Sequence, residues 1–100
     1  MKYSLVFSSE AEKEIIESIH WYNNQKKNLG FDFFDQLNLK LDLIIKNPLN
    51  YSTRFTNIRA TKITKYPYLI YFKINDHQSS IAILAVLHTS RDPKEISKRK

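Results

Sequence analysis

The sequence lacks cysteine, which excludes a disulfide framework and any metal site built on thiolates. It has a single glycine, and one glycine cannot build a glycine-rich phosphate-binding loop. No apolar run approaches the roughly eighteen residues that a transmembrane helix requires. The semi-apolar stretch near the N-terminus is too short for a signal peptide. We therefore expect a cytoplasmic protein that does not enter a membrane.

Acidic residues are scarce in the second half of the chain. Residues 51–100 hold ten basic and three acidic side chains, whereas residues 1–50 hold six basic and seven acidic ones. The overall net charge of +6 is therefore concentrated in one part of the sequence. Such a distribution suggests a basic patch for an acidic partner or a nucleic acid, or it serves solubility alone. The length of 100 residues and the 42% hydrophobic content fit a single globular domain over residues 1–100.

The N-terminal third of the chain has the pattern of a strand followed by a helix. Residues 2–7 alternate between polar and apolar, which indicates a short strand. Ser9 followed by Glu12 has the spacing of a capping box and predicts a helix start. The apolar residues that recur at helical spacing are Ala11, Ile15, Ile19 and Tyr22; the glutamates expected on the solvent side are Glu10, Glu14 and Glu17.

A second helix is expected over residues 31–46. We expect the first helix to fray at residues 23–24 and Gly30 to link the two helices, because glycine adopts positive φ without strain. The residues of the predicted buried stripe are Phe34, Leu37, Leu41 and Ile44, and those that widen the apolar surface are Phe33, Leu39 and Leu43. This wider surface suggests a face that another chain covers. Asn47 and Pro48 should end the helix.

Beyond Pro48 the apolar period changes from helical to alternating. Three strands are predicted at 57–64, 68–74 and 80–89, with turn residues at 75–78 that favour an antiparallel hairpin. The last strand is apolar on both faces, which is typical of a central strand. The predicted fold class is α+β: an N-terminal strand, a two-helix hairpin, then a three-stranded antiparallel sheet with a short C-terminal tail.

The histidines do not predict a metal site. His20, His77 and His88 form no pair with the spacing of metal ligands, and we expect no cofactor. Glu14 and Glu17 resemble a carboxylate pair, but at this spacing on a helix we interpret them as ordinary solvated residues.

The candidate functional residues are mainly basic and lie in the second half of the chain. They are Arg54, Arg59, Lys62, Lys65, His88 and Arg91, interleaved with Tyr66, Tyr68 and Tyr71. Cations that neutralise phosphates and rings that stack on bases would suit RNA. The tyrosines can equally be half-buried sheet residues, which strands favour.

Four segments occur in an order that resembles a known family. They are "WYNNQKKNLGFDFFDQL", "KNPLNY", "NIRATKITKYPYLIYFKI" and "ILAVLHTSRDP". Together they cover about residues 3–95 and resemble the RelE/ParE superfamily of bacterial toxin–antitoxin modules, of the plasmid-stabilisation type. The resemblance implies a small cytoplasmic toxin with a helical hairpin on an antiparallel sheet. It also implies a cognate antitoxin that binds the toxin directly in a hetero-oligomer.

The resemblance implies two alternative mechanisms. RelE-like members cleave mRNA on the ribosome, and in this chain Arg59, Lys62, His88 and Arg91 would carry that chemistry. However, Tyr68 or Leu69 replaces an arginine expected in the third strand, and no tyrosine follows Tyr71. ParE-like members act instead on DNA gyrase and lack this catalytic set.

We favour the gyrase-targeting branch, and therefore a toxin that is not an enzyme. The expected contacts to the target or the antitoxin are Arg59, Lys62, Lys65, Tyr68 and Arg91. We further expect Arg59 and Arg91 to lie near one another at the open end of the sheet, with His88 close by. The alternatives are the mRNA-cleaving nuclease and a degenerate member that only binds an antitoxin or itself.

Overall fold

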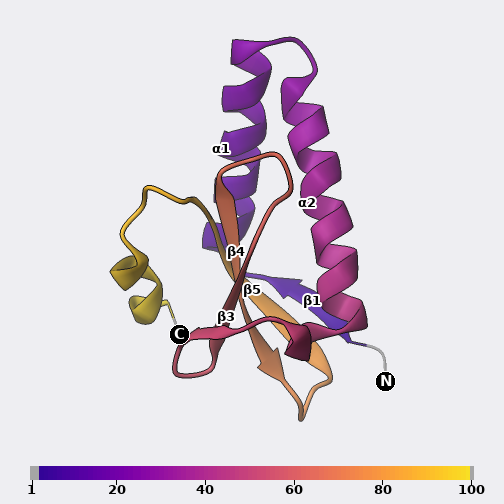
Figure 1. Ribbon diagram of the computed structural model, residues 1–100, viewed down its shortest axis with the longest axis vertical. Coiled ribbons are helices and arrows are strands. Elements are labelled where there is room, and N and C mark those ends of the chain that lie inside the picture. The colour runs from indigo at the N-terminus through magenta and orange to yellow at the C-terminus, as the bar shows by residue number, and fades with distance from the viewer. Residues whose placement is uncertain (1–2, 100) are drawn as a thin grey trace.

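A computed structural model describes residues 3–99 and contains a five-stranded sheet with a helical hairpin (Figure 1). The strands lie in the order β1-β5-β4-β3-β2. The elements are β1 (Ser4–Phe7), α1 (Ser9–Gln25), α2 (Leu29–Lys46), the 3₁₀ helix η1 (Pro48–Asn50), β2 (Thr53–Phe55), β3 (Ile58–Lys62), β4 (Tyr68–Asn75), β5 (Ser80–His88) and the 3₁₀ helix η2 (Pro93–Lys98). The α+β class and the two-helix hairpin are confirmed. No helix within residues 3–99 is long and apolar enough to cross a membrane.

The predicted three-stranded sheet is wrong in its strand count. β1 joins the sheet by pairing in parallel with β5, from Ser4 opposite Ser80 to Phe7 opposite Ile83. β2 adds a fifth strand against β3, and its three residues are too few to show an alternating pattern. The predicted first strand began at Lys2, which lies outside the described residues.

The antiparallel hairpin of β4 and β5 is confirmed, and it contains a β-bulge. Tyr71 pairs with Ala85 and Phe72 pairs with Ile83, so Leu84 is the extra residue of β5. The bulge shifts the alternation of β5 by one residue. Ile83 and Val86 consequently belong to the core under the helices, whereas Leu84, Ala85 and Leu87 belong to a second core on the other face.

These two cores lie on opposite faces of one sheet. The larger core joins the helical hairpin to the strands; its fully buried members include Phe33, Leu37, Ile44, Ile70 and Phe72. The smaller core lies on the face away from the helices, which we call the far face, and Ile96 of η2 completes it. η2 accordingly lies on the opposite side of the strands from α2 (Figure 1). Burial on both faces explains the continuous apolar run of β5.

Helix α1 starts one residue earlier than the capping pattern predicts. Ser8, not Ser9, is the N-cap, and its hydroxyl accepts a hydrogen bond from the Ala11 amide at 3.0 Å. Glu12 therefore does not complete a capping box. The helix also continues to Gln25, beyond the predicted fraying at residues 23–24.

Gly30 lies inside α2 rather than in the link between the helices, which corrects the prediction. The positive φ of the link belongs to Asn28, at 68°. The Gly30 amide donates to the Asn23 side chain at 2.7 Å, so Asn23 satisfies one of the free amides at the start of α2. A Cβ at position 30 would lie 2.1 Å from the Ile19 carbonyl oxygen. Glycine is thus required here for close helix packing.

The buried stripe of α2 differs from the prediction at one aromatic pair. Phe33 is fully buried, whereas Phe34 is 41% exposed. Leu39 and Leu43 are exposed as well, so the helical hairpin does carry apolar surface that the described residues leave uncovered. Asn47 and Pro48 end the helix as predicted.

Gly30→Ala should lower the free energy of unfolding by about 2–3 kcal/mol, because the new methyl group must separate the two helices. Urea denaturation followed by circular dichroism measures the loss. Asn24→Ala, at an exposed site of α1, is the control and should change stability by less than about 0.5 kcal/mol. Equal stability of the two variants would contradict the packing role of Gly30.

Tyr66 fastens the turn between β3 and β4 to α2, since its hydroxyl donates to Asp32 at 2.6 Å. Burial, and then this hydrogen bond, raise the pKa of Tyr66 to about 12. A raised pKa stabilises the folded protein below the unfolded value near 10, and that stability is lost as the pH rises from 10 towards 12. The stability difference between wild type and Tyr66→Phe should therefore be constant near neutral pH and shrink above pH 10 in urea titrations. A pH-independent difference would contradict this assignment.

Candidate functional site

An open cleft of about 230 Å³ lies between α1 and the paired ends of β4 and β5. Its lining residues are Glu14, Glu17, Ser18, Trp21, Tyr68, Val86, Leu87, His88 and Arg91. A second recess, formed by Trp21, Tyr22, Tyr68 and His88, shares three of these residues. Trp21, the chain's only tryptophan, has a large aromatic side chain that is nevertheless 56% exposed. The cleft therefore combines an aromatic wall with acidic and basic groups.

Tyr68 of β4 and His88 of β5 are cross-strand neighbours that line the cleft. They are paired in register, and their ring centroids lie 5.4 Å apart in an edge-to-face arrangement. Tyr68 also contacts Phe33 at 5.1 Å, so the larger core holds its ring in place. The register of the β4–β5 hairpin thus decides that these two side chains meet.

His88 is exposed, and its Nδ1 accepts a hydrogen bond from the Ser90 amide at 3.0 Å. Because a backbone amide only donates, Nδ1 is the acceptor in this hydrogen bond. Nδ1 also lies 2.9 Å from the Ser90 hydroxyl oxygen. In this conformation Nδ1 is engaged with Ser90 and is not free to contact a ligand.

Arg91 lies at the rim of the cleft, in the turn that follows β5. Its Nε and Nη2 donate to the two carboxylate oxygens of Glu95 at 3.1 and 2.8 Å. The hydrogen bond to Glu95 is the main cause of the raised pKa of Arg91. The guanidinium is thus charged and partly engaged, while half of the side chain remains exposed.

Arg59 does not reach the cleft, so the expectation that Arg59 and Arg91 lie together near His88 is wrong. Arg59 pairs with Phe72, four residues along β4 from Tyr68, the partner of His88. Four residues of a strand span about 13 Å. The Arg59 guanidinium instead donates to the Tyr51 carbonyl oxygen, so it ties β3 to the segment after η1.

The two lysines predicted as contacts lie outside the cleft as well. Lys65 occupies the turn between β3 and β4 with φ at 75°, and its Nζ lies 3.5 Å from Asp32. Lys62 ends β3 and is exposed on the far face. Of the predicted contact residues, the structure brings together only Tyr68 and Arg91, with His88 beside them.

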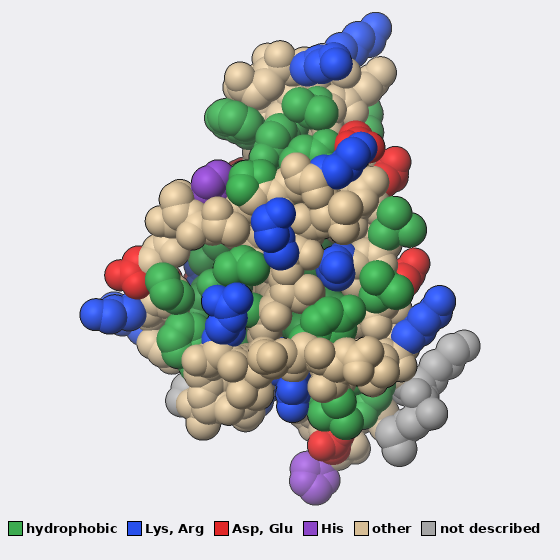
Figure 2. All heavy atoms as spheres, viewed as in Figure 1, with side chains coloured by type: hydrophobic (Ala, Val, Ile, Leu, Met, Phe, Trp, Pro, Cys, Tyr) green, Lys and Arg blue, Asp and Glu red, His purple; other side chains and the backbone are tan. Residues whose placement is uncertain are grey.

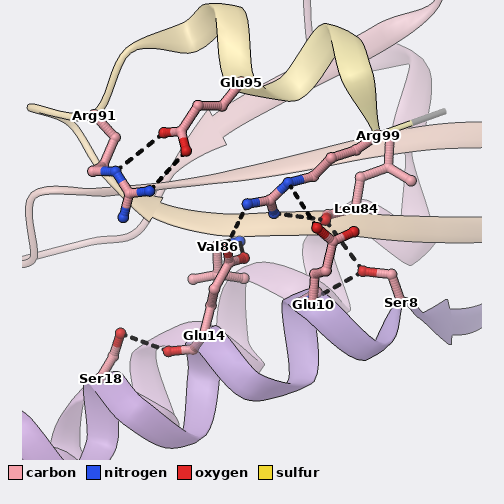
Figure 3. A network of polar contacts seen from close by, with 10 residues as sticks. Ser8, Glu10, Glu14, Ser18, Leu84, Val86, Arg91, Glu95 and Arg99 are labelled. Carbon is pink, nitrogen blue, oxygen red and sulfur yellow. Dashed lines mark hydrogen bonds and ion pairs between the residues drawn. The ribbon is translucent and has the colours of Figure 1, made fainter.

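The upper edge of the cleft is a part of β5 that has no neighbouring strand. β1 stops at Phe7 opposite Ile83, so residues 84–88 have no strand partner on that side. Side chains occupy this edge instead (Figure 3). The Leu84 carbonyl accepts from the Ser8 hydroxyl at 3.2 Å and from Arg99 at 3.3 Å, and the Val86 amide donates to Glu14 at 3.0 Å.

Glu14 and Arg99 form the centre of this network. Arg99 Nη2 lies 2.7 Å from the Glu14 carboxylate, and the two side chains are only 16% and 13% exposed. The hydrogen bond to Glu14 is the main cause of the raised pKa of Arg99. The interpretation of Glu14 as a solvated residue is therefore wrong, because Glu14 points at the open edge of β5. Glu17, one turn further, is exposed as expected.

The basic side chains do not converge on one point. In Figure 2, Lys and Arg side chains lie scattered over the face in view, while the acidic groups lie towards its margins. Within residues 3–99, no group of three His, Asp or Glu side chains is placed to hold a metal ion. Sequence patterns missed Glu14, Trp21 and Arg99, because their roles depend on the path of α1 across the end of β5.

Glu14→Ala should lower the free energy of unfolding by about 2–4 kcal/mol, because it removes the acceptor of the Val86 amide and the nearer of the two carboxylates that pair with Arg99. Chemical denaturation measures the loss. Glu17→Ala removes the same charge one turn away at an exposed position, and should change stability by less than about 0.5 kcal/mol. Similar effects of the two substitutions would show that the Glu14 contacts do not stabilise the fold.

Comparison with solved structures finds the same fold in toxins of two kinds. A chain of the chromosomal ParDE toxin–antitoxin system of P. aeruginosa superposes with a TM-score of 0.74 at 12% identity, over 87% of this chain and 96% of that one. A mutant of the E. coli toxin RelE in the free state gives 0.73 at 20% identity, over 99% and 94%. The E. coli RelBE toxin–antitoxin complex gives 0.70 at 21%, over 89% and 99%.

Comparison with protein families finds a match that covers most of the chain. No curated protein sequence matches the chain. The family model of the ParE toxin of the type II toxin–antitoxin system parDE matches residues 5–93, which include both helices and all five strands except Ser4. The chain therefore belongs to the ParE toxin family of type II toxin–antitoxin systems.

Proposed function

We propose that the protein inhibits bacterial growth by acting on DNA gyrase and that a cognate antitoxin neutralises it by direct binding. ParE-like toxins target gyrase, and the chain matches the ParE model over residues 5–93. We choose gyrase over mRNA as the target because the basic residues are dispersed and do not form one catalytic site. Arg59, Lys62 and Arg91 lie at three separate places, each in a different environment.

Cleavage of RNA needs several groups at one phosphate. A base must activate the ribose 2′-OH, cations must stabilise the negative charge of the transition state, and an acid must protonate the leaving oxygen. Here Arg59 binds a backbone carbonyl, Lys65 lies near Asp32, and Arg91 binds Glu95. This distribution argues against a nuclease and in favour of a toxin that works by binding.

The cleft offers the strongest support for the competing nuclease function. It holds the exposed His88 beside Tyr68 and Arg91, within reach of a ligand. However, the imidazole Nδ1 accepts from Ser90, and the nearest cations are already paired with carboxylates. We therefore assign the cleft to protein contact, with Trp21 as its exposed aromatic group.

The antitoxin is expected to cover the apolar surface of the helical hairpin. Ile16 and Phe34 are exposed and line an apolar groove of about 340 Å³ between α1 and α2. The structural relatives include toxin–antitoxin complexes, namely those of the ParDE and RelBE systems. By analogy, a helical or extended segment of the antitoxin would bury these side chains.

A supercoiling assay tests the proposal. The purified protein should block ATP-dependent supercoiling of relaxed plasmid by gyrase, while mRNA on translating ribosomes stays intact. Adding the antitoxin should restore supercoiling. Phe34→Glu should inhibit gyrase like wild type but respond poorly to the antitoxin, because a charge replaces an apolar contact.

Ribosome-dependent mRNA cleavage that disappears in His88→Ala or Arg91→Ala would overturn the gyrase proposal in favour of the nuclease. A protein that neither arrests growth on induction nor affects gyrase or mRNA would indicate a member that only binds. Lys13→Ala, at an exposed site of α1 outside the cleft, is the control and should behave like wild type in every assay.

A further inference from the structure

The far face of the sheet carries cations that neither the cleft nor the helical hairpin uses. Lys62 of β3 and Lys73 of β4 share this face with the buried Ile58, Ala60 and Tyr71. Arg54 of β2 is exposed beside them. We call Arg54, Lys62 and Lys73 the basic stripe.

The two lysines of the stripe are separated along the strand direction, and Arg54 lies across β3 from one of them. Lys62 pairs with Leu69 and Lys73 pairs with Ile58, so the two lysines lie four residues apart along β4, or about 13 Å. Arg54 lies level with the Lys73 end of this span, on the other side of β3, because its neighbours Thr53 and Phe55 pair with Arg59 and Ile58. Burial raises the pKa of Tyr71, which is midway along this span, and the nearby positive charge of Arg54 opposes that rise.

No carboxylate neutralises the stripe within residues 3–99. The ion pairs there join Lys65 to Asp32, Arg91 to Glu95, and Arg99 to Glu10 and Glu14. Of the acidic residues next to the sheet that form no ion pair, Asp76 accepts from the Tyr3 hydroxyl and Asp92 accepts from the Lys94 amide. The stripe therefore presents positive charge that no ion pair compensates.

The far face also lacks an exposed aromatic ring. The exposed aromatic side chains are Trp21, Phe31 and Phe34, all on the helices. Tyr71 is buried, and Phe55 packs against the smaller core. Proteins that bind single strands stack bases on exposed rings, whereas duplex contacts require only cations aimed at the phosphates.

From this arrangement we propose that the far face binds the phosphate backbone of duplex DNA through Arg54, Lys62 and Lys73. A span of about 13 Å covers roughly four nucleotides of one strand at 3.4 Å each. The contact carries no base specificity, because the stripe offers charges and no group arranged to read base edges. This surface lies on the opposite side of the sheet from the helical hairpin, so it does not depend on the proposed function.

Salt-dependent DNA binding tests the stripe quantitatively. Fluorescence anisotropy with a short labelled duplex should show weak binding that falls with salt, with a log–log slope of about −2.7 for three phosphate contacts. Affinity should fall about 40-fold between 50 and 200 mM salt. The double variant Lys62→Ala/Lys73→Ala should reduce the slope to about −0.9, because each lysine removes one contact.

The matched control is Lys13→Ala/Lys27→Ala, which removes the same net charge from exposed sites of the helical hairpin. It should keep the wild-type slope, and Lys62→Arg/Lys73→Arg should keep it as well. Equal slopes for the two alanine double variants would overturn the proposal, since binding would then follow net charge alone. Tighter binding of single-stranded DNA than of the duplex would also overturn the proposal. Displacement of the duplex by polyglutamate at equal charge concentration would overturn it as well, and would indicate an acidic protein as the partner.

Gyrase inhibition by the Lys62→Ala/Lys73→Ala variant separates the two proposals. If this variant loses the salt dependence of DNA binding but still inhibits gyrase, the result supports DNA binding by the stripe and does not affect the gyrase proposal. If the wild-type protein shows the expected salt dependence of DNA binding but never inhibits gyrase, only the proposed target is overturned. Thermal unfolding of each variant confirms that the substitutions at these solvent-facing positions leave the fold intact.

Discussion

The ion pair between Glu14 and Arg99 joins three segments, namely α1, the open edge of β5 and the C-terminal segment that contains η2. β1 ends opposite Ile83, so the last five residues of β5 have no strand partner on that side, and an unpaired edge is prone to wrong pairing. Glu14 binds the Val86 amide and Arg99 binds the Leu84 carbonyl. One carboxylate thus fastens α1 to the sheet edge and to the C-terminal segment at the same time. The wall of the cleft is a consequence of this contact.

The bulge at Leu84 is the second constraint on the site. Without it, strict alternation would place Ala85 under the helices and Val86 on the far face. With it, Val86 fills the larger core and Leu84 and Leu87 fill the smaller one. The same shift sets His88 on the helix side, opposite Tyr68. An irregularity of one residue in the central hairpin therefore determines both the packing and the composition of the cleft.

The distribution of charge separates the molecule into surfaces with different chemistry. The helical hairpin exposes apolar side chains, the cleft combines aromatic and paired ionic groups, and the far face presents unpaired cations. Arg59 and Lys62 are close in sequence and were assigned to one site. On a strand, however, residues 59 and 62 point to opposite faces, because three steps along a period of two reverse the side. Proximity in sequence was therefore a poor guide to a shared surface.

The sequence by itself determined the class of each main element, the stop of α2 at Pro48, the β4–β5 hairpin and the family. These depend on local spacing, turn chemistry and proline geometry, which act over a few residues. Only the tertiary structure decided the parallel pairing of β1, the close packing at Gly30 and the role of Glu14. Glu14 and Val86 lie 72 positions apart, so no local pattern links them. Whether this glutamate is solvated or half-buried depends on where the helix crosses the sheet, and that crossing follows from the packing of the whole core.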